Sequence, residues 1–170
     1  MGEEVYREER FQLSRPARVT EIDVTSMPWH PAVVHFPIVL LILAVAIDLA
    51  ALVRREPSWH ATAWRLLVGG TVCALVAVLT GDASAAAYRE AEGTADLVQQ
   101  HEDAATLCLL VFAAVSLGRL PLALGRSTDW LLYWIALSVV GVGLLVYASN
   151  LGGELVFVHG VGVSLETAMP

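Results

Sequence analysis

The stretch WHPAVVHFPIVLLILAVAIDLAAL, residues 29–52, decides the fold. After Pro31, only His35, Pro37 and Asp48 interrupt an apolar run that matches the roughly 20 residues a helix needs to cross a bilayer core. Counting onward, the sequence predicts four such spans, at about 32–53, 61–80, 101–120 and 130–149. The fold expected is all-α: a membrane-embedded four-helix transmembrane bundle.

Polar segments flank this bundle at both ends of the chain. We expect an extramembrane N-terminal arm over residues 1–28, a transmembrane domain over 29–163 and a short C-terminal tail over 164–170. The arm has no apolar core that would make it a signal peptide. No internal repeat is apparent in the sequence. A net charge of −7 makes a nucleic-acid partner improbable, whereas a lipid bilayer is required.

Arginine counts predict the orientation of the spans. The first and third links hold five arginines, Arg54, Arg55, Arg65, Arg119 and Arg126, whereas the second link holds only Arg89. Basic residues mark the cytoplasmic side, so the second link and both termini are expected to be periplasmic. The predicted location is the inner membrane of a bacterium.

Four of the five histidines then fall at the periplasmic face. His30 and His35 open the first span, His101 opens the third, and His159 follows the fourth. At 100° per residue, His30 and His35 point about 140° apart, so they cannot both face one partner in a regular helix. Pro37, which lacks an N–H, predicts an irregular turn or a later helix start there.

A b-type haem needs two neutral imidazoles on facing helices and an apolar slot between them. His35 and His101 are the axial ligands that the sequence favours, because both are helical and lie slightly inside the membrane. His30 and His159 are further candidates, and Arg89 is a candidate partner for a haem propionate. The chain would then be an electron-transfer subunit of a respiratory or photosynthetic complex.

Two alternatives remain open at this stage. The four histidines, with a carboxylate, could form a zinc or copper site. The bundle could instead be a cofactor-free structural or assembly subunit, in which His30 only starts a helix. The cysteines, Cys73 and Cys108, form no CxxC pattern, which excludes covalently attached c-type haem. No nucleophilic constellation indicates an enzyme.

Two features concern packing within the membrane. Asp48 is expected to pair with Arg54, Arg55 or Arg65 near the inner face, because an unpaired charge inside a span is costly. A second feature is a seam of small residues spaced four apart along the second span, where a neighbouring helix can approach closely. Its members are Gly69, Cys73, Ala77 and Gly81.

Three motifs resemble those of an uncharacterised family of bacterial four-helix membrane proteins, a domain of unknown function. They are HPAVVHFPIVLLILAVAIDL in the first span, HEDAAT at the third, and NLGGELVFVHGVGV after the fourth. The resemblance covers about residues 29–163 and implies no established activity. It implies an association with respiratory modules, so a periplasmic cytochrome or an iron–sulfur protein is an expected partner. The motif histidines at matching positions are His30, His35, His101 and His159.

Overall fold

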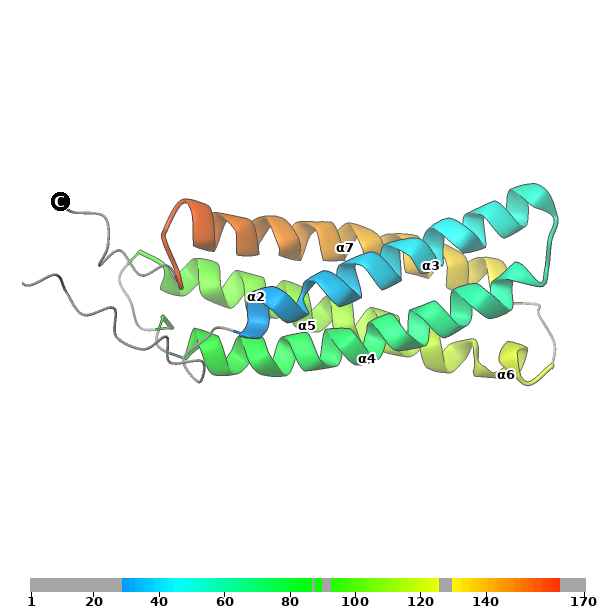
Figure 1. Ribbon diagram of the computed structural model, residues 1–170, viewed down its shortest axis with the longest axis horizontal. Helices are drawn as coiled ribbons and strands as arrows, with labels where there is room; N and C mark the ends of the chain where they lie inside the picture. Colours follow the sequence, from blue (N-terminus) through cyan, green and yellow to red (C-terminus); the bar gives the residue numbers. More distant parts are fainter. Residues whose placement is uncertain (1–28, 87, 90–92, 126–129, 163–170) are drawn as a thin grey trace, which may run out of the picture.

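A computed structural model of the chain describes residues 29–86, 88–89, 93–125 and 130–162. These residues form helices and turns, with no strand among them. The elements, in chain order, are α2 (Trp29–Val33), α3 (His35–Arg54), α4 (Trp59–Ala85), α5 (Ala95–Gly118), α6 (Leu120–Ala123) and α7 (Leu131–Phe157). Figure 1 shows the four long helices lying side by side as one elongated bundle.

All four predicted spans are confirmed as helices long and apolar enough to cross a membrane. Each is longer than the apolar run that predicted it: the four stretches are Trp29–Arg54, Trp59–Ala85, Ala95–Leu122 and Leu131–Phe157. The reason is physical. Backbone hydrogen bonding continues through polar residues at the membrane boundary, where hydropathy has already fallen. The predicted arm, 1–28, and tail, 164–170, lie outside the described residues.

Pro37 breaks the first span near its start. Its ring nitrogen cannot donate to the carbonyl of Val33, and the helix is interrupted at Val34 between α2 and α3. The irregular turn expected from the sequence is therefore present. As a result, the two histidines near the start of the span lie in different helices. His30 in α2 is partly buried, whereas His35 in α3 is exposed.

The helices run up and down in sequence order. Helix α3 packs on α4 to form a first helical hairpin, and α5 packs on α7 to form a second. The two hairpins meet through α4 on α5 and α3 on α7. This arrangement leaves α3 and α5 diagonally opposite each other across the bundle axis (Figure 1). Side chains that point inward from α3 and α5 therefore meet at the axis.

The two hairpins are related position by position. Asp48 and Arg119, which contact each other, are 71 residues apart. Adding 71 to the number of a buried residue in the first hairpin repeatedly gives a buried residue in the second hairpin. These pairs are Pro37 and Cys108, Leu41 and Phe112, Ala44 and Val115, Val45 and Ser116, Leu67 and Ser138, Gly70 and Gly141, Ala74 and Leu145, Ala77 and Ala148. The bundle is thus an internal repeat of two helical hairpins about a pseudo-two-fold axis along its length.

This repeat of structure is not apparent in the sequence. Most related core positions carry different apolar residues, such as Leu41 and Phe112, because a lipid-embedded core constrains size and fit more than identity. A few related positions keep the same residue, including Gly70 and Gly141, which receive the side chains of Leu41 and Phe112. The repeat is visible only once these contacts are known.

The predicted small-residue seam is partly wrong in its register. Gly69 has open space where a Cβ would lie, whereas a Cβ on Gly70 would lie 2.8 Å from Leu41. Ala77 is buried as expected, and Gly81 lies against His30. Close packing on α4 therefore follows Gly70, Ala74, Ala77 and Gly81, because it must match the inward face of α3.

A buried ionic cluster joins α3 and α4 to Arg119, the residue that follows α5, at the end of the bundle opposite α2. The carboxylate of Asp48 accepts hydrogen bonds from Nη1 and Nη2 of Arg119, the latter at 3.0 Å, and lies 2.7 Å from Nδ1 of His60. Asp48 and Arg119 are each 1% exposed. The expected partners Arg54, Arg55 and Arg65 are exposed instead, since their helix faces point away from the axis.

Reversing a single charge in this cluster is expected to destabilise the bundle strongly. Asp48→Arg or Arg119→Asp alone places two like charges together in the core, and breaking a buried pair typically costs about 3–5 kcal/mol. The double variant Asp48→Arg/Arg119→Asp places each residue at its symmetry-related position and should recover much of that loss. Thermal unfolding in detergent measures this, and a double variant as unstable as either single one would contradict the pairing.

Paired glycine substitutions test the packing register. Gly70→Ala and Gly141→Ala should lower the unfolding temperature, because the new methyl groups meet Leu41 and Phe112, which are fully buried. Gly69→Ala and Gly143→Ala are matched controls in open space and should be neutral or slightly stabilising, since alanine favours helix by about 1 kcal/mol. Equal effects at all four sites would refute the register.

Candidate functional site

The imidazole of His30 is held on the neighbouring helix α4. Its Nδ1 lies 2.8 Å from the carbonyl oxygen of Ala77 and 3.4 Å from the hydroxyl of Thr80. A carbonyl only accepts, so Nδ1 carries the proton and donates it to Ala77. Gly81 allows the ring to lie against α4, because a Cβ there would be 2.8 Å from ring atom Cε1.

The imidazole of His101 is held on α7 in the same way. Its Nδ1 lies 2.9 Å from the carbonyl oxygen of Ala148, and a Cβ on Gly152 would lie 3.1 Å from its Cε1. Each histidine donates to an alanine 47 residues further along the chain. The two sets of residues are therefore one arrangement repeated by the pseudo-two-fold axis: His30, Ala77 and Gly81 in one hairpin, and His101, Ala148 and Gly152 in the other.

The two rings meet across the axis. Their centroids are 6.3 Å apart and their planes are nearly perpendicular, at 81°. Because Nδ1 of each ring is the donor, Nε2 of each neutral ring carries a lone pair. No hydrogen-bond partner for either Nε2 is found among the described residues. Two fixed imidazoles with unused lone pairs thus lie at one end of the bundle.

The other two candidate histidines lie outside this pair. His35, favoured from the sequence as the partner of His101, is exposed at the start of α3. His159 is exposed just after α7, with Nδ1 3.3 Å from the carbonyl oxygen of Glu154 in its own turn. The break at Val34 accounts for the difference, since it leaves α2 to direct His30 inward while His35 begins a separate helix.

Arg89 lies at the same end of the bundle, but its guanidinium is already paired with two carboxylates. Its guanidinium donates to Glu102 through Nε at 3.3 Å and Nη2 at 2.7 Å, and also to Asp82. These hydrogen bonds, above all those to Glu102 and then the one to Asp82, raise the pKa of Arg89 above its ordinary value. Both ion pairs are partly exposed, so their contribution to stability is small. Arg89 therefore links the α4–α5 connection to α5 in the described residues.

Both histidines of the pair could be predicted from the sequence, but their hydrogen-bond partners could not. The signal that was available is the repeated pattern of a histidine followed 47 residues later by an alanine and four residues after that by a glycine. Three matching positions in 170 residues are too few to distinguish from chance in an Ala- and Gly-rich chain. Only the contacts give the pattern meaning.

No curated protein and no solved structure matches this chain. One protein family does match, over residues 26–165, which includes all four long helices and both histidines of the pair. The chain therefore belongs to the family described as "Predicted membrane protein (DUF2231)".

Proposed function

We propose that this membrane protein binds one b-type haem between His30 and His101 and transfers electrons within a larger membrane complex. The observation that carries the proposal is the symmetric imidazole pair, with each Nδ1–H fixed on a carbonyl oxygen and each Nε2 unused. Histidine ligands of metals almost always donate their second nitrogen in this manner, which fixes the tautomer and orients the ring.

The separation of the rings supports the same ligand. An imidazole nitrogen binds a metal at about 2 Å, and a ring centroid lies roughly 1.2 Å behind its nitrogen, so two opposed ligands have centroids about 6.4 Å apart. The centroids of His30 and His101 are separated by 6.3 Å. This separation supports the proposal that the two rings bind one metal ion from opposite sides.

The surroundings favour a flat, apolar cofactor. Ala104, Ala148 and Leu151 form a hydrophobic cluster beside His101, with Leu97 and Ala105 packed against it. These apolar side chains suit a porphyrin better than a hydrated ion. When bound, the haem would supply one-electron redox chemistry, and its two histidine ligands would leave no open iron position for substrate. The residues thus favour electron transfer over catalysis.

A zinc or copper site has less support. Such sites use three or four protein ligands, and no group of three His, Cys, Asp or Glu side chains able to hold a metal occurs among the residues that the structure describes. A cofactor-free structural bundle is the second candidate. It accounts for the hydrogen bonds to Ala77 and Ala148 but gives no role to the two unused Nε2 atoms.

The arginine distribution supports a periplasmic position for the histidine pair. A redox partner would then approach from the periplasm, and a cytochrome or an iron–sulfur protein has suitable chemistry. The acidic side chains at this end include Asp82, Asp96, Glu102 and Asp103, which favour a partner with a basic surface.

Histidine variants test the assignment of ligands. The purified wild-type protein, expressed with sufficient haem, should show a Soret band and sharp reduced α- and β-bands. His30→Ala and His101→Ala should each lose most of the haem or convert it to five-coordinate form, because each removes one axial ligand. Added imidazole should restore the six-coordinate spectrum in either variant. His35→Ala is the matched control and should keep the wild-type spectrum, since His35 is exposed.

Two outcomes would contradict the proposal. One is a folded wild-type protein that remains colourless after haem is supplied. The other is a spectrum that depends on His35 but not on His30.

A glycine variant tests whether the position of the ring matters. Gly81→Ala should reduce haem occupancy several-fold, because the methyl group would displace the ring of His30 from its hydrogen bond to Ala77. Gly153→Ala, on the same turn as Gly152 but with only Phe157 at 4.0 Å, is the control and should leave occupancy unchanged. Haem content per chain, measured after denaturation, is the readout. Full occupancy in Gly81→Ala would show that the hydrogen bond to Ala77 is dispensable.

A further inference from the structure

The two histidines of the imidazole pair are carried by backbone segments of different kinds. His30 lies in α2, a helix of five residues none of which is buried, and Val34 separates α2 from α3. His101 lies in the second turn of α5, a continuous helix of 24 residues. Buried Val98 and Ala104 hold α5 in place on either side of His101. The pseudo-two-fold axis therefore relates the two rings but not the segments that carry them.

The turn between α2 and α3 has few hydrogen bonds to hold it. Pro37 has no N–H to donate to the carbonyl oxygen of Val33, and the amide nitrogen of Ile38 lies 3.4 Å from the carbonyl oxygen of Val34. Backbone hydrogen bonds in proteins typically measure about 2.9–3.0 Å between nitrogen and oxygen. This turn is suited to act as a hinge, because a movement there breaks few hydrogen bonds.

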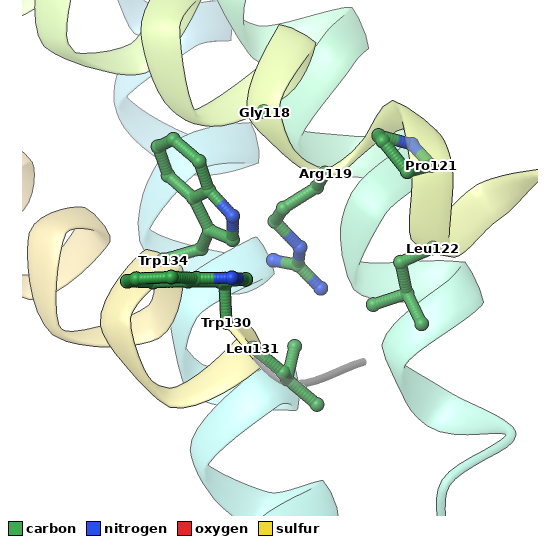
Figure 2. Close-up of a pocket in the computed structure, with 7 residues that line it drawn as sticks. All are labelled: Gly118, Arg119, Pro121, Leu122, Trp130, Leu131 and Trp134. Atoms are coloured by element: carbon green, nitrogen blue, oxygen red, sulfur yellow. The ribbon is translucent and has the colours of Figure 1, made fainter. Parts of the chain in front are cut away.

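The long helices are fixed to each other at the opposite end of the bundle. Asp48 of α3 is paired with Arg119, the residue that follows α5. Figure 2 shows the Arg119 side chain extending into the bundle beside Trp134. Because this buried pair joins α3 to the end of α5, a movement at the hinge would carry His30 away without displacing the helix that holds His101.

The hydrogen bonds of the two imidazoles differ as well. The carbonyl oxygen of Ala77, which accepts from Nδ1 of His30, also lies 3.1 Å from the hydroxyl of Thr80, a second donor. In the second hairpin the residue related to Thr80 is Leu151, which has no hydroxyl. An oxygen that accepts two hydrogen bonds is a weaker acceptor for each, and a weaker acceptor at Nδ1 makes an imidazole a weaker metal ligand. We therefore expect His30 to be the weaker ligand of the pair.

Thr80 also lowers the cost of moving His30. If the ring leaves, the carbonyl oxygen of Ala77 keeps the hydrogen bond from the Thr80 hydroxyl. At the related position Leu151 can donate no hydrogen bond to Ala148, so a departing His101 would be replaced by no other side chain there. An acceptor left without its partner costs free energy, and this cost falls on one ring only.

The surroundings indicate which kind of molecule could take the place of the ring. The hydrophobic cluster beside the pair consists of Ala104, Ala148 and Leu151. A charged or strongly hydrated ligand would lose its water there without gaining hydrogen bonds, which is costly. A diatomic gas carries no charge, is small, and dissolves in the lipid around the bundle. The site therefore favours a diatomic gas over an anion.

We propose that, in the haem-loaded protein, His30 is the exchangeable ligand and His101 the permanent one, so that a diatomic gas binds in place of His30. This inference rests on the proposed function and adds a binding activity to it. In the exchange, the bond from iron to Nε2 of His30 breaks, a bond from iron to the gas forms, and no electron is transferred. The hinge at Val34 then couples gas binding to the position of α2.

The first experiment identifies the histidine that leaves. The full-length, haem-loaded protein is reduced in detergent and titrated with carbon monoxide, and the absorption spectrum and the C–O stretching frequency are recorded. Wild type should bind carbon monoxide with the same stretching frequency as His30→Ala, since His101 is the remaining ligand in both. His101→Ala should give a different frequency, because its remaining ligand donates to the shared oxygen of Ala77.

A second variant keeps both ligands. Thr80→Val should bind carbon monoxide about fivefold more weakly, because Ala77 then accepts from the His30 side chain alone and the ring is held more tightly. Thr71→Val is the matched control on α4. Its hydroxyl also donates to the carbonyl oxygen four residues earlier, that of Leu67, but it lies about 14 Å further along the helix at 1.5 Å per residue. This control should bind carbon monoxide as wild type does.

The outcomes distinguish this inference from the haem proposal. A six-coordinate wild-type haem that binds no carbon monoxide would overturn the inference and leave the haem proposal standing. So would a wild-type stretching frequency equal to that of His101→Ala, or a Thr80→Val variant that binds carbon monoxide as tightly as wild type. A folded wild-type protein that takes up no haem would overturn both proposals.

Discussion

The meeting of α3 and α5 across the bundle axis is the constraint on which the rest of the structure depends. Two polar contacts lie at the ends of these diagonal helices. One is the ion pair between Asp48 of α3 and Arg119, which follows α5, and the other is the imidazole pair of His30, in the preceding α2, and His101 of α5. In a lipid environment, apolar side chains gain little from leaving the solvent, so helix association relies on close fit and on polar contacts. Glycines at matching positions of α4 and α7 provide the close fit.

The two ends of the axis have opposite character, although one symmetry relates the two hairpins. At the histidine end the related residues are identical, and equal groups face each other as two ligands of one ion would. At the other end the related residues are Asp48 and Arg119, which neutralise each other and leave one donor, Nε, unused. An acid and a base at related positions hold the bundle together, whereas two identical bases with free lone pairs are better suited to binding.

Much of the fold could be predicted from the sequence, because span length and hydropathy follow directly from bilayer thickness. The histidine layer could also be predicted, since topology alone brings His30 and His101 to one face. Which histidines meet could not be predicted: it depends on the break at Val34, where a missing N–H of Pro37 redirects one turn of chain. Helical periodicity correctly indicated that His30 and His35 diverge, but not which of them points inward.

The partner of Asp48 and the internal repeat could not be predicted from the sequence, for a different reason. Arg119 follows the last residue of α5 and, by sequence, belongs to a basic link near the membrane boundary. Its long side chain reaches the bundle interior only because α5 lies diagonal to α3, which is a property of the assembled bundle. Likewise, most related positions of the two hairpins carry different apolar residues. A comparison of the two halves of the sequence therefore shows little similarity.

The measurement that tests the central claim most directly is the electron paramagnetic resonance spectrum of the oxidised, haem-supplied protein. Two neutral imidazoles with planes 81° apart should give one low-spin ferric species with the strong anisotropy expected for nearly perpendicular axial ligands. Quantified against haem content, that species should account for about one haem per chain, because the site has one pair of ligands. A high-spin signal, or no haem signal from a folded protein, would contradict the claim that His30 and His101 together hold a haem.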